Sequence, residues 1–230
     1  MNNINTFSKS CLNFKANDFM SPSSSYADKI YPANGEKSKT IIYKPKAPEA
    51  QHKPFISWPD GTGVVHALTL FKNKSGEIMT RLVVQERPAM GGVKTIEAPA
   101  GKYGEHGSNE TALEGAGREV EEETGLSPIE VVPLSPAPYS TSPGITNELK
   151  DFALVIAKDE GNERELTESE KAQKAECVDV PLSTITDTNK FLKWQTNMKD
   201  KGMVCNIDIP VLKGLINGNP VAEKHIDAMA

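Results

Sequence analysis

An acidic run near the middle of the chain restricts the possible folds more than any other segment. Residues 118–126 read REVEEETGL, and Glu119, Glu122 and Glu123 stand at positions i, i+3 and i+4. In a helix these three side chains share one face, where their like charges repel one another. A divalent cation converts this repulsion into binding, because hard cations such as Mg²⁺ prefer carboxylate oxygens.

A glutamate run on a helix is usually a solvated surface, and this alternative has to be weighed against metal binding. Ala112, Ala116 and Val120 form an apolar stripe beside the acidic face, so the helix can pack while its carboxylates face a groove. Only Arg118 offers a positive charge close by in the sequence, so the cluster is not neutralised. Glu121 points away from the other three glutamates and is expected to be solvated surface.

The acidic helix has defined ends in the sequence. Ser108 or Asn109 can cap its start, and Gly125 can supply a left-handed stop. Apolar and β-branched runs around it predict strands, with a hairpin turn at 74–77. We expect strands at 63–71, 80–86, 95–97, 129–132, 152–157 and 177–180, and helices at 189–199 and 209–217. This mixture indicates an α/β protein, an α/β/α sandwich around a mixed β-sheet.

Charge and cysteine usage limit the possible partners. The formal net charge is -5 and basic blocks are missing, so the sequence predicts no nucleic-acid binding. No apolar run approaches membrane length, which predicts no membrane insertion. The 3 cysteines, Cys11, Cys177 and Cys205, are widely spaced, so we interpret them as free thiols in a reducing compartment and expect a cytoplasmic protein.

The spacing around the acidic run resembles the signature of the Nudix hydrolases. Gly104 is followed after five residues by Glu110, and after seven more by the run at 118–126. The resemblance implies the sandwich fold with a loop-helix-loop catalytic motif. It also implies that Glu119 and Glu123 are the principal metal ligands and that Glu122 is a further ligand or a catalytic group that orients water. Arg118 would be the catalytic-site partner that holds a glutamate in place.

The flanking segments are similar to those of ADP-ribose pyrophosphatases, the ADP-sugar diphosphatases of this family. The resemblance implies that the backbone carbonyl of Ala100, in the Pro-Ala-Gly turn, binds the metal. It implies that Arg87, before Pro88, contacts the diphosphate, and that Gly144 lies at the substrate. Ser142 stands where the eukaryotic-type enzymes carry an acidic residue that touches the substrate, so the terminal group of the substrate stays open.

The implied reaction is hydrolysis of the diphosphate bond of ADP-ribose or a related ADP-sugar, which gives AMP and a sugar phosphate. The implied cofactor is Mg²⁺, in two or more ions, with Mn²⁺ as a substitute. Two alternatives stay open. The chain can act on another nucleoside diphosphate-X, such as NADH or a nucleotide sugar, or it can be a non-catalytic sensor of ADP-ribose.

A polar segment at 159–176 is expected to be a loop beside the site. Most of its acids are interpreted as solvated, but long loops near a site can carry catalytic groups. In the resembled enzymes such a loop ends with a glutamate that reaches the metal or activates water. Glu176 is best placed for this catalytic role, and Glu168 and Glu170 are the alternatives.

Composition divides the chain into four parts. Residues 1–38 are rich in Ser, Asn and Lys and are expected to form a flexible arm, and residues 39–60 contain a short strand and a proline-rich linker. Residues 61–220 are the expected catalytic domain, and residues 221–230 are a tail. In the resembled family the N-terminal part contacts a second subunit, which implies a homodimer. Trp58 would then stack on adenine in the substrate site, although simple packing is the alternative.

Overall fold

The computed structural model describes residues 27–31, 41–45, 55–57, 63–104, 108–140, 142, 146, 148–162, 164 and 166–230. Two of the expected substrate-binding residues, Trp58 and Gly144, and the thiol of Cys11 lie outside these ranges. The chain divides into two compact units. Unit 1 comprises Met1–Val64, Lys102–Ala112 and Pro136–Asp151, and unit 2 comprises Val65–Gly101, Leu113–Ser135 and Phe152–Ala230.

Unit 1 contains a small antiparallel sheet. Its strands, in spatial order, are β1 (Ala27–Tyr31), β2 (Ile41–Pro45) and β3 (Phe55–Ser57). Strand β2 contains most of the short strand expected after residue 39. Strand β1 lies within residues 1–38, for which a flexible arm was expected. It pairs with β2, and such a pairing between separate segments cannot be read from composition.

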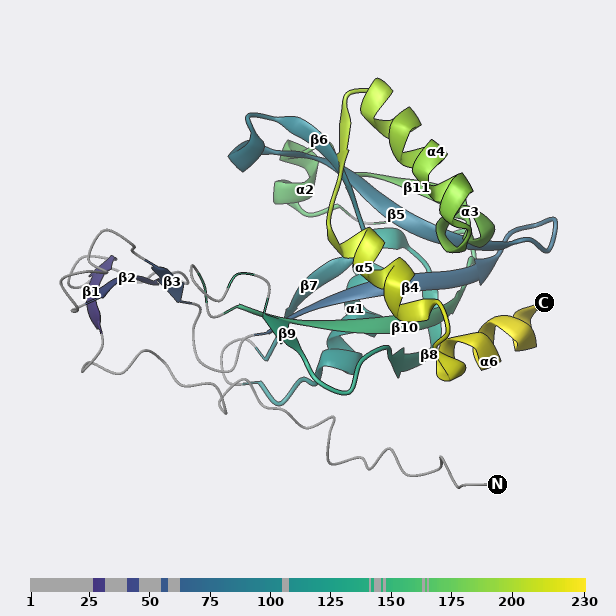
Figure 1. Cartoon of the computed structure of the whole chain (residues 1–230), viewed down its shortest axis with the longest axis horizontal. Helices are drawn as coiled ribbons and strands as arrows, with labels where there is room; N and C mark the ends of the chain where they lie inside the picture. The colour runs from purple at the N-terminus through teal and green to yellow at the C-terminus, as the bar shows by residue number, and fades with distance from the viewer. Residues whose placement is uncertain are drawn as a thin grey trace. The chain divides into compact units, whose positions relative to one another are not determined.

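The main sheet is mixed (Figure 1), and its central path runs β12-β6-β5-β4-β10-β8. Strand β11 also pairs with β5, β7 with β4, and β9 with β10. Strand β5 is antiparallel to β4, β6 and β11, whereas β12 is parallel to β6. The strands are β4 (Gly63–Lys72), β5 (Ile78–Arg87), β6 (Val93–Glu97), β7 (Ala100–Tyr103), β8 (Ser127–Pro133), β9 (Tyr139–Ser140), β10 (Leu149–Lys158), β11 (Glu176–Pro181) and β12 (Met203–Cys205).

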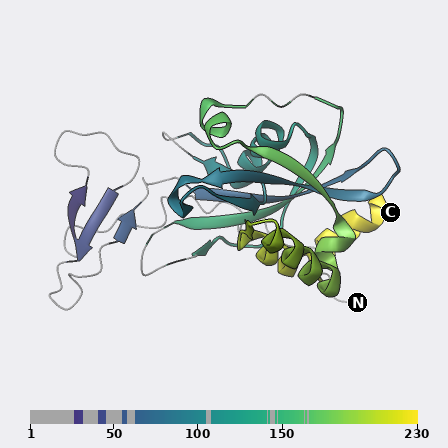
Figure 2. The same cartoon turned by 90° about the horizontal axis from the view of Figure 1, so that it is seen from above.

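Helices cover both faces of this sheet. The helices are α1 (Ala112–Thr124), α2 (Glu168–Ala172), α3 (Leu182–Thr186), α4 (Thr188–Asp200), α5 (Asp208–Ile216) and α6 (Pro220–Met229), with a 3-10 turn at Pro88–Met90. Figure 2 shows α1 and α2 on one side of the strands and α4 on the other. This arrangement confirms the expected α/β fold. No helix among the described residues is long and apolar enough to span a membrane.

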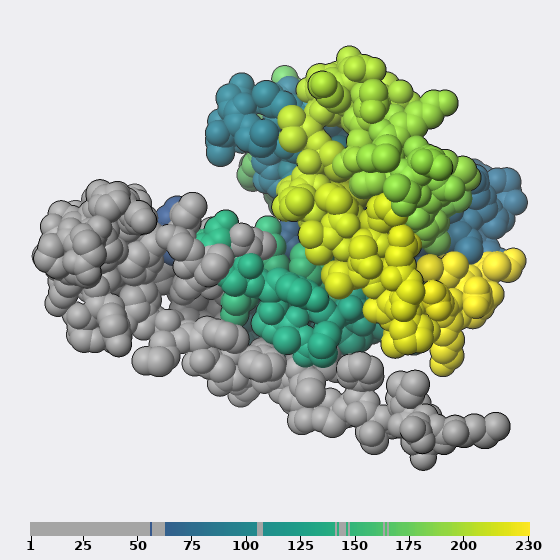
Figure 3. Space-filling view, viewed as in Figure 1, coloured from purple at the N-terminus to yellow at the C-terminus, as the bar shows by residue number. Residues whose placement is uncertain are grey.

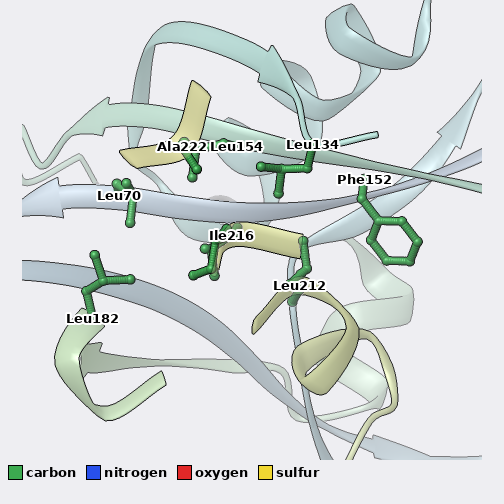
Figure 4. Close-up of a cluster of buried hydrophobic side chains, with 10 residues drawn as sticks. Leu70, Leu134, Phe152, Leu154, Leu182, Leu212, Ile216 and Ala222 are labelled. Atoms are coloured by element: carbon green, nitrogen blue, oxygen red, sulfur yellow. The ribbon is translucent and has the colours of Figure 1, made fainter. Parts of the chain in front are cut away.

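The helices at the C-terminal end of the chain cover one face of the domain, as the yellow-green and yellow atoms of Figure 3 show. Beneath them, α5 and α6 contribute Leu212, Ile216 and Ala222 to an apolar cluster with strand residues such as Leu70 and Leu154 (Figure 4). A second cluster contains Ile209 of α5. Burial of these side chains supplies the main free energy that holds α5 and α6 on the sheet.

Several elements differ from the expectations. Residues 221–230, expected to be a tail, form most of α6, since Asn219 caps the helix by accepting hydrogen bonds from Val221 N (3.0 Å) and Ala222 N (3.3 Å). The polar segment 159–176 is not wholly a loop. It contains α2, which begins with a capping box formed by Thr167 and Glu170. Strands β7 and β12 and helix α3 were not expected, because each is too short to show a periodic pattern of apolar residues in the sequence.

Candidate active site

Helix α1 carries the acidic run and packs through the predicted apolar stripe. Ala116 and Val120 are fully buried, whereas Glu121 is exposed as expected. Gly125 ends the helix with a φ of 70° and donates its N–H to the carbonyl of Glu121 at 2.9 Å. The left-handed stop is therefore confirmed.

The predicted N-terminal caps of this helix are wrong. Helix α1 begins at Ala112, so Ser108 and Asn109 lie in irregular backbone before its first turn. The sequence offered several polar residues before the apolar stripe, and propensity alone does not choose among them.

Two of the three predicted acidic ligands meet one short piece of backbone. The carboxylate of Glu119 lies against Gly101, where a Cβ atom would overlap it. The carboxylate of Glu123 accepts a hydrogen bond from the backbone N–H of Ala100 at 2.8 Å. Glu122 is not brought to this point, because its side chain is 58% exposed and binds Arg118. Glu119 and Glu123 therefore meet this backbone, whereas Glu122 is linked to Glu119 through Arg118.

Arg118 connects these acidic side chains. Its Nη1 donates to Glu119 Oε1 at 2.6 Å and to Glu122 Oε2 at 2.9 Å. The Glu119 side chain is only 13% exposed, so the guanidinium restricts where its carboxylate can lie. Arg118 therefore lies where the family resemblance places a residue that holds a glutamate.

Glu123 is a carboxylate in an unfavourable environment. Burial raises the pKa of Glu123 to about 8, and the charges of Glu119 and Glu170 add to this effect, while the Ala100 hydrogen bond and Arg164 oppose it. Without a cation, ionising Glu123 beside Glu119 costs free energy. A bound divalent cation removes this cost, because it favours the ionised form of both carboxylates.

Arg87, the predicted diphosphate contact, lies at the end of β5 and pairs with Glu97 at the end of β6. Its Nε donates to Glu97 Oε1 at 2.7 Å, and its Nη2 donates to the second carboxylate oxygen. Burial alone would raise the pKa of Glu97, but hydrogen bonds from Arg87 and Thr95 outweigh burial and lower it. The pair fixes the plane of a guanidinium that remains 40% exposed.

The loop carboxylates lie in three different environments. Glu176, the first choice for the catalytic loop residue, is more than half exposed and pairs with Lys94 of β6 at 2.8 Å. Glu168 is almost fully exposed and pairs with Lys171. Glu170 is largely buried, pairs with Arg164, and raises the pKa of Glu123 through its charge. Among the three candidates, Glu170 is the one that pairs with Arg164, and its charge raises the pKa of Glu123.

Sequence reasoning did not identify Arg164, which links this loop to the end of α1. Its Nη1 donates to Cys177 Sγ at 3.4 Å, and Cys177 Sγ donates to the carbonyl of Glu123 at 3.3 Å. The signal available in the sequence was an arginine placed among many acids in the segment 159–176.

A second missed residue, Arg81 of β5, holds the C-terminal end of α1. Its Nη1 donates to the carbonyl of Thr124 at 3.1 Å, and its other nitrogens pair with Asp179 and Asp159. A cation at this position favours the helix dipole and satisfies a terminal carbonyl. Arg81 and Arg164 therefore fix the turn of the helix that carries Glu123.

The donors at this site fit a hard divalent cation. The described residues contain no ready-formed group of three or more His, Cys, Asp or Glu side chains around a metal position. They do place two carboxylates, Glu119 and Glu123, against the backbone of Ala100 and Gly101. Carboxylate and carbonyl oxygens are the donors that Mg²⁺ takes, and waters and substrate phosphates usually complete its coordination.

Fold and site together define the class of protein. A model of the NUDIX domain matches residues 63–198, more than half of the chain, and the chain belongs to this family. Members are hydrolases of nucleoside diphosphate-X compounds, which are small nucleotide substrates, and they generally use divalent metal ions such as Mg²⁺. No curated protein is similar enough to the chain to count as a match.

Proposed function

We propose that this chain hydrolyses the diphosphate bond of ADP-ribose or a related ADP-sugar and releases AMP and a sugar phosphate. The observation that carries the proposal is the meeting of Glu119 and Glu123 at the backbone of Ala100 and Gly101. The choice of an ADP-sugar rests on the resemblance of the segments around Arg87 and Ala100 to those of ADP-ribose pyrophosphatases.

The proposed metal-binding groups are Glu119, Glu123 and the carbonyl of Ala100, with Glu122 as a further group. When bound, Mg²⁺ would supply positive charge that neutralises the diphosphate and makes water more acidic. Arg118 holds the carboxylate of Glu119 in place. The donation from the Ala100 N–H fixes the carboxylate of Glu123 in the same way.

The remaining roles concern the diphosphate and the attacking water. Arg87 is oriented by its pair with Glu97, so its guanidinium can donate to a phosphate without losing its own alignment. A carboxylate of the polar loop, Glu170 or Glu176, would accept the proton of the water. Efficient proton transfer requires that this carboxylate lie within hydrogen-bond reach of the water in the bound state.

The direct test replaces Glu123 by glutamine. We expect Glu123→Gln to lower kcat for ADP-ribose by about a thousandfold, the scale of several kcal/mol of lost electrostatic stabilisation. The matched control is Glu121→Gln, which removes an exposed carboxylate from the same helix and should leave kcat unchanged. The rates are measured with Mg²⁺ present, after circular dichroism has shown that both variants are folded. Wild-type turnover in Glu123→Gln would refute the proposed site.

A substrate panel separates this proposal from the alternatives. ADP-ribose, an ADP-hexose, a UDP-sugar and NADH are incubated with the protein and Mg²⁺, and the products are identified by mass. The proposal requires AMP and ribose 5-phosphate from ADP-ribose, at a higher kcat/KM than for the other compounds. Calorimetric binding of ADP-ribose without any hydrolysis would instead establish the sensor.

A further inference from the structure

The part of the chain that follows the family match contributes directly to the turn beneath the site. The match ends at residue 198, and β12 and α5 come after it. Strand β12 adds a parallel partner to β6, with Cys205 opposite Ile96, and the N–H of Asn206 donates to the carbonyl of Ile96 at 2.9 Å.

Asp208, the first residue of α5, is a buried carboxylate with three hydrogen-bond donors. Its side chain accepts from the backbone N–H of Ala98 at 2.9 Å, from the N–H of Ile209 at 2.8 Å and from His66 Nδ1 at 3.2 Å. The residue is 2% exposed. A buried carboxylate is costly unless its bonds are made, and apolar residues often replace buried ion pairs without loss of stability. Stability alone therefore does not explain why an acid stands at this position.

The backbone between β6 and β7 suggests the reason. Three consecutive residues are each fixed by a different element of unit 2. The N–H of Ala98 is held by Asp208, the carbonyl of Pro99 accepts from Ala67 N at 2.9 Å, and the N–H of Ala100 donates to Glu123. Proline has a fixed φ, which removes one of the torsions that would let Ala98 and Ala100 move independently.

We propose that Asp208 is a positioning residue for the pair formed by Ala100 and Glu123. Asp208 fixes the distance between the backbone of Ala98–Ala100 and α1, and therefore the position of the Glu123 carboxylate. It does so without contacting substrate or cation. His66 holds the Asp208 carboxylate in the orientation that faces Ala98. This inference rests on the proposed function for its kinetic consequence, whereas its structural consequence can be measured on the metal-free protein.

The first test is Asp208→Asn, which keeps the size of the side chain but leaves one oxygen acceptor for three donors. We expect the amides of Ala98 and Ala100 to exchange with solvent about tenfold faster or more, in metal-free protein followed by nuclear magnetic resonance. We expect kcat to fall about 10- to 100-fold, the usual effect of a lost supporting contact, with KM almost unchanged. The control is Asp187→Ala, which removes the cap that Asp187 makes with Lys190 N on α4. It should lower stability without changing either readout.

The second test needs no change at Asp208, so it remains valid if Asp208→Asn does not fold. Coupling is reciprocal, so Glu123→Gln should change the exchange rate of the Ala98 amide as well as that of Ala100. An unchanged Ala98 amide in Glu123→Gln, or an unchanged Ala100 amide in folded Asp208→Asn, would overturn the inference. Failure of the proposed function would give a different result. The wild-type protein would hydrolyse no substrate of the panel, while the exchange rates of the Ala98 and Ala100 amides would still change in the variants.

Discussion

Glu119 and Glu123 place two carboxyl groups one helical turn apart, and the fold directs both to a single short piece of backbone. Glu123 can approach because Ala100 offers an N–H, and Glu119 can approach because Gly101 has no side chain. Both arrangements depend on main-chain atoms of Ala100 and Gly101, the first two residues of β7. The position of this backbone therefore sets how far apart the two carboxylates lie.

Gly101→Ala tests this dependence. The added Cβ overlaps the carboxylate of Glu119, which is the end of a flexible side chain and can move aside. We expect a folded protein of nearly unchanged melting temperature that binds Mg²⁺ about tenfold more weakly or worse, measured by calorimetry. The control is Gly117→Ala on α1, whose Cβ would make an ordinary contact of 3.5 Å with Val131. Equal affinity in both variants would show that the Glu119 position does not matter.

The pair formed by Arg87 and Glu97 predicts a pH-dependent stability. The pKa of Glu97 is lowered from 4.5, so its stabilising contribution is present above pH 4.5 and is lost as the pH falls through the lowered value. Glu97→Gln should lower the free energy of unfolding by about 1.5–3 kcal/mol at pH 7, the range for hydrogen bonds to charged groups. Urea denaturation should show that this deficit shrinks below pH 4.5. A deficit that stays constant down to pH 3 would contradict the assignment.

At the scale of elements, the sequence identified those with long periodic patterns. The acidic helix, the hairpin of β4 and β5, and helices α4 and α5 were expected within a few residues of their ends, because each buries an apolar face of sufficient length. It did not identify β7, α3 or β12. Those elements are fixed by pairing and packing with residues far away in the sequence, which no local pattern records.

Helix α2 gives the polar loop a defined shape, and a prediction follows for its carboxylates. Glu170→Gln keeps the capping box with Thr167, because glutamine can also serve there, but it removes the charge that acts on Glu123. We expect kcat to fall about a hundredfold, the scale of general base catalysis, whereas Glu176→Gln should stay within about twofold of wild type. The kcat of each variant is measured under steady-state conditions. A larger fall in Glu176→Gln than in Glu170→Gln would indicate that Glu176 is the catalytic residue.

The site was predictable in part for a related reason. Glu119 and Glu123 were suggested by their spacing on one helix and Arg118 by the family resemblance. In the structure the two glutamates lie at the backbone of Ala100 and Gly101, and Arg118 bonds Glu119. Glu122 shares the predicted face but lies toward solvent, since helical periodicity gives a direction and not the distance to a neighbouring turn. Asp208 comes from a segment far along the chain, and its meeting with Ala98 depends entirely on the tertiary fold.

At the scale of the whole molecule, the domain extends beyond the residues that the family model matches. Helices α5 and α6 supply Leu212, Ile216 and Ala222 to the main apolar cluster, and Ile209 enters the second. Without α5 and α6, both clusters would lose part of their apolar cover. The homodimer and the cytoplasmic location stay predictions, because each concerns the surroundings of the chain.

Truncation measures this contribution. A chain that ends at residue 202 loses β12, α5 and α6, and we expect it to lack the near-ultraviolet circular dichroism of a packed core. A chain that ends at residue 219 loses only α6, including the buried Ala222. It should fold with a free energy of unfolding lower by roughly 2–4 kcal/mol, measured in urea. A native spectrum for the shorter chain would show that the matched region folds alone.

The close approach of Glu119 to Gly101 also limits how the enzyme can evolve in the laboratory. Every amino-acid substitution that one nucleotide change makes in a glycine codon introduces a Cβ, so each step away from this codon moves the carboxylate. Libraries made by error-prone amplification and selected for turnover should therefore retain glycine at position 101, whichever substrate is used in the selection. Diversity is better directed to exposed positions nearby, where many codons encode a tolerated residue.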